Sequence, residues 1–144
     1  MKISTKGQYA LEAIVDLHLH NPDGYESLHT LAQRRHLSES YLEQLFARLK
    51  KAGLVQSLRG AQGGYRLSRP ADTMRAGEVL RAVEGDLSPV RCVCDGTTPC
   101  PRERDCSTRG FWSRMMGEIN AVVDGVTIAE LVEAARNRAL DYSI

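Results

Sequence analysis

Apolar residues recur every three or four positions near the start of the chain, which is the spacing of one helix face. The pattern predicts a helix from about Thr5 to His20. Its inward face consists of Tyr9, Ala10, Ala13, Ile14 and Leu17. The Asn-Pro-Asp-Gly stretch at residues 21–24 is a turn signal. After this turn, Ser27 is the expected N-cap of a short helix that runs through Arg34.

A third helix is predicted after a short break at residues 35–37. Its apolar stripe, at positions i, i+3, i+4 and i+7, consists of Leu42, Leu45, Phe46 and Leu49. Ser40 and Glu43 have the spacing of a capping box, in which each side chain bonds a backbone N–H of the other residue. Gly53 stands where a left-handed residue would end the helix. Two short helices separated by such a break are typical of a helix-turn-helix.

A β-hairpin is predicted directly after the third helix. Residues 54–58 and 65–67 have the composition of strands, and the Arg-Gly-Ala-Gln-Gly-Gly stretch at residues 59–64 joins them as a flexible turn. Pro70 closes this segment. A helix-turn-helix followed at once by a hairpin is the order of a winged helix, and the arginine at the base of the hairpin tip favours a binding role over a plain surface turn.

Three further segments complete the chain. A fourth helix is expected from Ala76 to Gly85, and residues 86–106 form a long loop. A strongly amphipathic helix then ends near Gly125, and Thr127 and Glu130 form a capping box that opens a last helix. The fold class is therefore mainly α with one small β-hairpin. We expect three units: residues 1–85, a winged-helix DNA-binding domain; residues 86–106, a cysteine-containing loop; and residues 107–144, a long helix followed by the C-terminal helix.

Composition places the 144-residue chain among ordinary globular proteins, with 42% hydrophobic and 26% charged residues. The first residues lack the apolar core of a signal peptide, and no stretch approaches the roughly 18 apolar residues of a membrane helix. We therefore expect a cytoplasmic protein without a membrane partner. In that compartment, four cysteines favour metal binding or redox sensing over structural disulfides.

The net charge of +1 conceals an asymmetry between the two halves of the chain. Residues 1–75 carry 11 Lys and Arg against 7 Asp and Glu, whereas residues 76–144 carry 8 against 11. A positive excess in the front half is compatible with binding to nucleic acid phosphates but does not establish it.

The candidate DNA-reading surface is the polar face of the third helix together with the hairpin. A recognition helix presents its N-terminal residues to base edges in the major groove, where Gln suits adenine and Glu suits cytosine. Hydroxyl groups suit phosphates, and an arginine on the hairpin suits a narrow minor groove. Lys50 and Lys51 fit a solvated helix end equally well. The predicted DNA contacts are Ser38, Ser40, Tyr41, Glu43, Gln44, Arg59 and Gly60, and Glu39 and Arg48 lie on the same polar face.

All four cysteines lie within fifteen residues, at Cys92, Cys94, Cys100 and Cys106. Thiolates are soft ligands for zinc, copper(I) and iron–sulfur clusters, and a loop rich in Gly and Pro allows them to converge. The spacing is neither that of a zinc ribbon nor that of a ferredoxin. Four thiols in one loop nevertheless favour a ligand set over inert surface thiols, whereas the four histidines lie far away in sequence and are not expected to be ligands.

Three stretches together resemble the Rrf-type winged-helix transcription regulators. They are residues 1–7 (Met-Lys-Ile-Ser-Thr-Lys-Gly), residues 40–45 (Ser-Tyr-Leu-Glu-Gln-Leu), and residues 52–65 from Ala-Gly-Leu-Val to Gly-Gly-Tyr. The resemblance covers nearly the whole chain. The family includes IscR-like, NsrR-like and CymR-like branches. It implies a homodimer joined by the long helix near residues 107–124, with two winged helices reading a palindromic duplex.

In the iron–sulfur branches of this family, the resemblance implies that three loop cysteines hold a [2Fe–2S] or [4Fe–4S] cluster that controls DNA affinity. Cys94, Cys100 and Cys106 match the even spacing, whereas Cys92 matches the position of the first ligand better, so both remain candidates. The fourth ligand is also open, because Arg109 replaces the histidine of IscR-like members and Gln8 replaces the aspartate of NsrR-like members.

Two alternatives stand beside a cluster-controlled regulator. One is a zinc- or thiol-based winged-helix regulator of sulfur metabolism, since residues 87–90 (Leu-Ser-Pro-Val) also resemble the CymR-like branch. The other, more remote, is a small cysteine-dependent redox enzyme or electron carrier. The sequence shows no general base near the cysteines and no nucleotide-binding glycine loop, so no catalytic residue is predicted.

Overall fold

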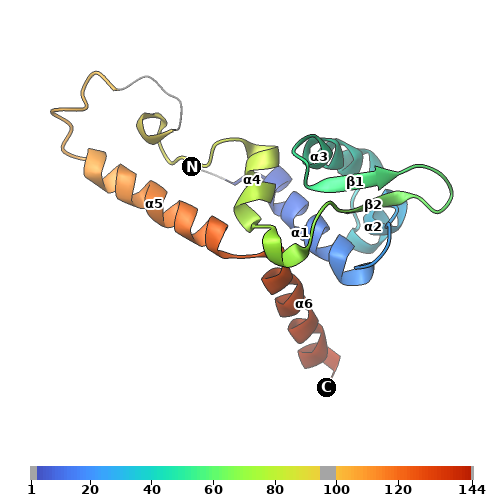
Figure 1. Cartoon of the computed structure of the whole chain (residues 1–144). Coiled ribbons are helices and arrows are strands. Elements are labelled where there is room, and N and C mark those ends of the chain that lie inside the picture. The colour runs from blue at the N-terminus through green and yellow to red at the C-terminus, as the bar shows by residue number, and fades with distance from the viewer. Residues whose placement is uncertain (1–2, 95–99, 144) are drawn as a thin grey trace.

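The computed structural model describes residues 3–94 and 100–143. Figure 1 shows a mainly helical chain with one small hairpin at one edge, in agreement with the expected fold class. In chain order the elements are α1 (Thr5–His20), α2 (Leu28–Arg35), α3 (Glu39–Lys51), β1 (Val55–Leu58), β2 (Gly64–Leu67), the 3-10 turn η1 (Ala71–Thr73), α4 (Ala76–Glu84), the 3-10 turn η2 (Arg91–Val93), α5 (Arg109–Gly125) and α6 (Ile128–Ser143).

The core lies where α1, α3, α4 and the start of α6 meet. Phe46 of α3 is fully buried, and its ring packs 5.0 Å from that of Tyr65 on the hairpin. Ile128 and Val132 of α6 close the core from the other side of α1. The other large side chains with almost no exposed surface are Ile14, Leu17, Leu31, Leu42, Leu45, Leu49, Met74 and Val79. Burial of this apolar area supplies the main driving force for folding.

The hairpin is antiparallel, with Val55 opposite Leu67 and Leu58 opposite Gly64. A short third partner comes from the α1–α2 connection, because Glu26 and Tyr65 exchange two backbone hydrogen bonds of 2.9 and 2.8 Å. A Cβ atom at position 64 would lie 2.1 Å from the Glu26 carbonyl oxygen. Glycine is therefore required there, and it allows the hairpin to join the helical body.

Most of the predicted helix limits agree with the structure. Gly53 adopts a positive φ of 78° after α3, and the Thr127–Glu130 capping box is present, with both of its hydrogen bonds. The proposed Ser40–Glu43 capping box is wrong. Ser38 caps α3 instead, because its side chain accepts a hydrogen bond of 3.0 Å from the Tyr41 N–H.

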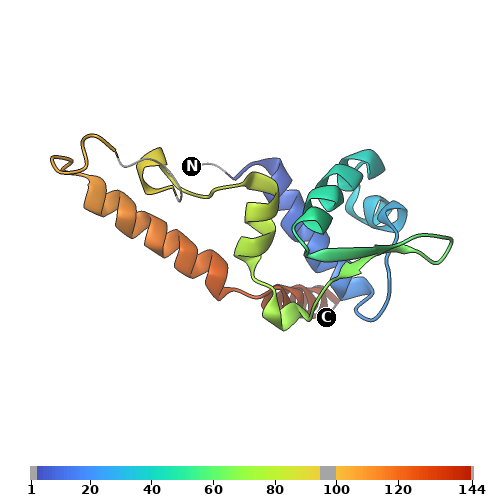
Figure 2. The same cartoon turned by 45° about the horizontal axis from the view of Figure 1, so that its top comes forward.

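Helix α5 extends away from the rest of the chain, and none of its residues is buried. Phe111 is 56% exposed and Val122 is 64% exposed. Figures 1 and 2 place the hairpin tip at one end of the molecule and the start of α5 at the other, with α4 between α5 and α3. No helix in the described ranges combines the length and the apolar character that crossing a membrane requires.

Candidate DNA interface and cysteine segment

The polar face at the N-terminal end of α3 is exposed, on the side opposite the apolar stripe. Ser38, Ser40, Glu43 and Gln44 are all exposed, as the polar face of a recognition helix requires. The Ser38 hydroxyl accepts the cap hydrogen bond and keeps its own proton for a further acceptor. The neighbouring Glu39 carboxylate lies 3.2 Å from Nδ1 of His29 at the surface. Two base-reading candidates, Glu43 and Gln44, therefore sit together on an accessible helix face.

Two residues on the predicted polar face have other contacts. The ring of Tyr41 packs edge-on against that of Tyr9 at 6.1 Å, so its aromatic body belongs to the α1–α3 contact. Arg48 donates a hydrogen bond of 3.0 Å from Nη1 to the Val83 carbonyl at the end of α4. The sequence placed Arg48 correctly on the polar face but gave no signal for this partner.

The hairpin tip extends beyond the helical body (Figure 1), and Arg59 and Gly60, which follow β1, are exposed. Gly60 has a φ of 109°, which L side chains rarely adopt, and its carbonyl accepts a hydrogen bond of 3.0 Å from the Gly63 N–H. Lys50 ties the end of α3 to β1 through a bond of 2.7 Å to the Ser57 hydroxyl. Helix α3 and the hairpin therefore form one connected surface.

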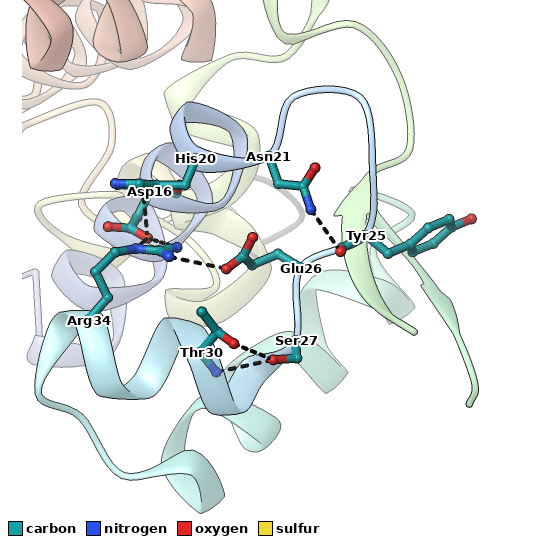
Figure 3. Close-up of polar contacts among 8 residues, drawn as sticks. All are labelled: Asp16, His20, Asn21, Tyr25, Glu26, Ser27, Thr30 and Arg34. Atoms are coloured by element: carbon teal, nitrogen blue, oxygen red, sulfur yellow. Dashed lines mark hydrogen bonds and ion pairs between the residues drawn. The ribbon is translucent and has the colours of Figure 1, made fainter. Parts of the chain in front are cut away.

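A partly buried arginine joins the segments behind this surface, as Figure 3 shows. The Arg34 Nε and Nη2 atoms lie 2.7 and 2.5 Å from Oδ1 of Asp16, and Nη1 lies 3.1 Å from Glu26. These carboxylates raise the pKa of Arg34 above its usual value despite the opposing effect of burial. Because Glu26 also pairs with Tyr65, Arg34 of α2 is linked to both α1 and the hairpin. The residue pattern gave no signal for this cluster, because its charges lie 18 and 8 positions apart along the chain.

A second polar cluster holds the N-terminus of α1 against the end of α4. Oε1 of Glu84 accepts hydrogen bonds from the Ser4 N–H at 2.9 Å, the Ser4 hydroxyl at 2.5 Å and the Gly7 N–H at 2.8 Å. These bonds, led by that from the Ser4 hydroxyl, lower the pKa of Glu84. A Cβ atom at Gly7 would lie 2.7 Å from the Glu84 carboxylate, so a side chain there would displace it. This contact gives a physical role to the Ser-Thr-Lys-Gly stretch at residues 4–7.

The cysteine segment connects α4 to α5. Cys92 lies within η2, which is held to residue 88 by a hydrogen bond of 3.4 Å from the Ser88 hydroxyl to the Val93 carbonyl. Cys92, Cys94 and Cys100 are half-buried, whereas Cys106 is exposed. Residues 95–99 of the predicted loop lie outside the described residues.

Cys106 lies just before the first turn of α5. Its Sγ atom is 3.5 Å from the Thr108 hydroxyl. Hydrogen bonds from Thr108, first from its side chain and then from its backbone, lower the pKa of the Cys106 thiol. The thiolate is the form of cysteine that binds metals.

The donor set of this segment fits an iron–sulfur cluster in its chemistry, since four thiols lie in one connecting segment and one has a lowered pKa. Within residues 3–94 and 100–143, no three His, Cys, Asp or Glu side chains are arranged to hold a metal ion. Metal binding and local folding are commonly coupled in metalloproteins.

Comparison with known proteins gives a consistent result. Residues 3–134 match the family model of Rrf2, described as an iron-dependent transcriptional regulator. The transcriptional regulator IscR of Yersinia pseudotuberculosis is 39% identical over 132 residues, which cover 92% of this chain and 79% of that protein. The relatives are named as transcriptional regulators, which confirms the expectation of a transcription regulator.

Two solved structures have the same fold at similar sequence identity. CymR, the global cysteine regulator of B. subtilis, superposes with a TM-score of 0.75 at 40% identity, covering 93% of this chain and 98% of that one. IscR of T. potens superposes with a TM-score of 0.73 at 39% identity, covering 94% and 88% of the two chains. The winged-helix fold expected from the sequence is therefore confirmed.

Proposed function

Because the chain belongs to the Rrf2 family of transcriptional regulators, we propose that it acts as a homodimer on a palindromic DNA duplex and that its cysteine segment holds an iron–sulfur cluster which controls DNA affinity. In this assignment residues 1–85 read the DNA, residues 86–106 bind the cluster and residues 107–144 join the two copies. The observation that carries the proposal is the exposed face of α3 beside the hairpin, within a chain 39% identical to a regulator named IscR.

The reading role falls on the residues predicted from the sequence. Glu43 and Gln44 are exposed on the first half of α3 and suit base edges in the major groove. Ser38 and Ser40 begin the helix and suit phosphates, since the positive end of a helix dipole favours an anion. The Tyr41 hydroxyl can also donate a hydrogen bond to a DNA phosphate, and the contact of its ring with Tyr9 holds it against α1. Arg59 and Gly60 at the hairpin tip suit the neighbouring minor groove.

The dimer proposal rests on the uncovered apolar face of α5. This face includes Phe111 and Val122, both more than half exposed, and the Phe111 ring packs against that of Trp112 at 4.9 Å. A large exposed apolar surface is typical of an interaction site. A second copy is the proposed occupant, since two such helices packed together would each cover the other.

The cluster proposal assigns Cys92, Cys94, Cys100 and Cys106 as the ligand candidates. When bound, the cluster would supply a redox- and iron-responsive state. The chain's own contribution is to present these thiols on a segment fixed to α4 at one end and α5 at the other. The CymR likeness supports a second candidate function, regulation through zinc or bare thiols, and the same measurement separates the two.

The first experiment is an absorption spectrum of anaerobically purified protein, with iron, sulfide and zinc measured on the same sample. We expect visible charge-transfer bands with iron and sulfide in matching amounts, and we expect Cys100→Ala and Cys106→Ala to lack them. Ser107→Ala, next to Cys106, is the matched control and should keep them. Parallel Cys92→Ala and Cys94→Ala samples identify the first ligand. Normal cluster content in both Cys100 and Cys106 variants would contradict the proposal, and a colourless protein containing zinc would favour the second candidate.

The reading surface is tested by Gln44→Ala in a gel-shift assay, with a palindromic duplex first selected for binding to the wild-type protein. Loss of one bidentate base contact should weaken binding by about 1–3 kcal/mol and relax the preference at one base pair. Asn137→Ala, which removes an exposed amide from α6, is the control and should bind as the wild type does. Equal affinities for all three proteins would remove Gln44 from the reading surface.

A further inference from the structure

The carboxyl end of α4 is joined to the recognition helix through a backbone group. The last four carbonyl groups of a helix have no partner within that helix. At the end of α4, the Arg81 carbonyl is bonded by the Gly85 N–H at 3.0 Å, and the Val83 carbonyl is bonded by Arg48 of α3 at 3.0 Å. A cation at this position also interacts favourably with the negative end of the α4 dipole.

The contact links the end of α3 to a defined point of the chain. Arg48 lies one turn after Gln44, so displacement of its anchor acts on the same rigid helix that carries the reading residues. The side chain is otherwise exposed, which means that little apolar packing depends on it. Among the cations in the last turn of α3, Arg48 is bonded to the end of α4, whereas Lys50 is bonded to Ser57 of β1.

The same point is where the cysteine segment begins. Gly85 ends α4 with a φ of 81°, and Leu87 follows as a buried anchor with 4% of its surface exposed. The Ser88 hydroxyl then bonds the Val93 carbonyl, which lies in the turn that contains Cys92. The backbone of residues 84–88 thus connects η2 to Val83, and the Arg48 guanidinium connects Val83 to α3.

We propose that Arg48 is a positioning residue for DNA reading, which fixes the last turn of α3 to the end of α4 so that α3 follows any displacement at the start of the cysteine segment. The inference rests on the reading surface proposed above. The sequence placed Arg48 only on the polar face of the third helix and assigned it no partner.

The test is a double-mutant cycle read out by DNA affinity. Arg48→Gln removes the guanidinium. Gly85→Ala strains the end of α4 without a change of charge, because an alanine disfavours the positive φ at this position. The added Cβ itself would meet no neighbouring atom. Specific and non-specific binding are measured over a range of salt concentrations for each single variant and for the pair. Lys51→Gln, in the same last turn, is the matched control for the lost charge.

We expect Arg48→Gln to weaken operator binding on the order of tenfold, within the usual range of coupling between sites, while the salt slope and non-specific binding stay unchanged. Gly85→Ala should weaken binding in the wild type and have little further effect beside Arg48→Gln, because both act through one contact. If Gly85→Ala does not fold, Leu87→Ala replaces it in the cycle as the substitution that disturbs the segment after α4.

Two outcomes overturn the inference. Additive effects in the cycle, together with a salt slope reduced by about one in Arg48→Gln, would show a direct phosphate contact. Equal behaviour of Arg48→Gln and Lys51→Gln would show that only charge matters. Failure of the wild-type protein to bind any duplex would instead contradict the proposed function, so the two failures are distinguishable.

Discussion

The reading head, residues 3–85 with the first turns of α6, differs in construction from the extension, residues 86–126. The head holds the core, and its partly buried charges are bonded to one another, as in the Arg34 cluster. Among the described residues of the extension, Leu87 alone is buried, and the apolar side chains of α5 remain partly or largely exposed. The two regions have similar apolar residue types but opposite degrees of burial.

The difference indicates that the two regions depend on different partners for stability. The head contains the groups that cover its own apolar surface, so its stability resides within one chain. The extension exposes apolar side chains and thiols that require an external partner, for which we propose a second copy and a cluster. Matched substitutions in the two regions test this distinction.

The largest difference is expected between Phe46→Ala and Phe111→Ala. Phe46 is fully buried, so its truncation should lower the free energy of unfolding by about 3–5 kcal/mol. Phe111 is 56% exposed, so the same change should cost the isolated chain no more than about 0.5 kcal/mol. Denaturant unfolding at several protein concentrations measures both, and dimerisation through α5 predicts that Phe111→Ala changes the concentration dependence. Equal losses in the two variants at low concentration would contradict the distinction.

An intermediate difference is expected between two arginines. Arg34→Met leaves the buried carboxylates of Asp16 and Glu26 without their cation and should cost about 3 kcal/mol. Arg109 pairs with Glu103 at 3.0 Å, with both side chains more than a third exposed, so Arg109→Met should cost less than about 0.5 kcal/mol. Thermal unfolding of iron-free protein is the measurement. If Arg34→Met leaves the free energy of unfolding almost unchanged, the ion pairs of Arg34 with Asp16 and Glu26 do not stabilise the head.

The smallest effect is expected for Glu84→Gln, at the end of α4 where the head meets the extension. Hydrogen bonds from Ser4 lower the pKa of Glu84 from its usual 4.5, so this carboxylate stabilises the fold above about pH 4.5 and the contribution is lost as pH falls through the lower folded pKa. The variant should be about 1 kcal/mol less stable than the wild type at pH 7. Denaturant unfolding between pH 7 and pH 3 should show the gap closing in acid. A gap that does not depend on pH would mean that the charge of Glu84 contributes nothing.

The hydrophobic pattern predicted the helices because each one has a continuous apolar face, even in α5, where that face is not buried. It failed at the start of α3, where both Ser38 and Ser40 precede the apolar stripe. The choice depends on His36, which adopts a left-handed φ of 55° and ends α2, so that the chain is already extended at Ser38. A non-glycine residue in that conformation is uncommon and has no clear signal in the sequence.

The sequence predicted those features of the candidate site that depend on a single element, and it missed those that depend on contacts between elements. The exposed positions of Glu43 and Gln44 follow from the helix period. The contacts of Arg48 with Val83 and of Glu84 with Ser4 join residues 35 and 80 positions apart. One of these partners is a backbone carbonyl, which every residue has, so residue types could not identify it.

The pairing of Glu26 with Tyr65 has a consequence for the entropy of association. It fixes the root of the hairpin to the helical body before any duplex arrives, whereas residues 59–63 form the exposed turn beyond the paired strands. Ordering one backbone residue costs about 1–2 kcal/mol, so fixing the root in advance confines this cost to the few residues of the tip. With the root fixed in advance, only the tip remains to be fitted to a groove, which limits the entropic cost of the final complex.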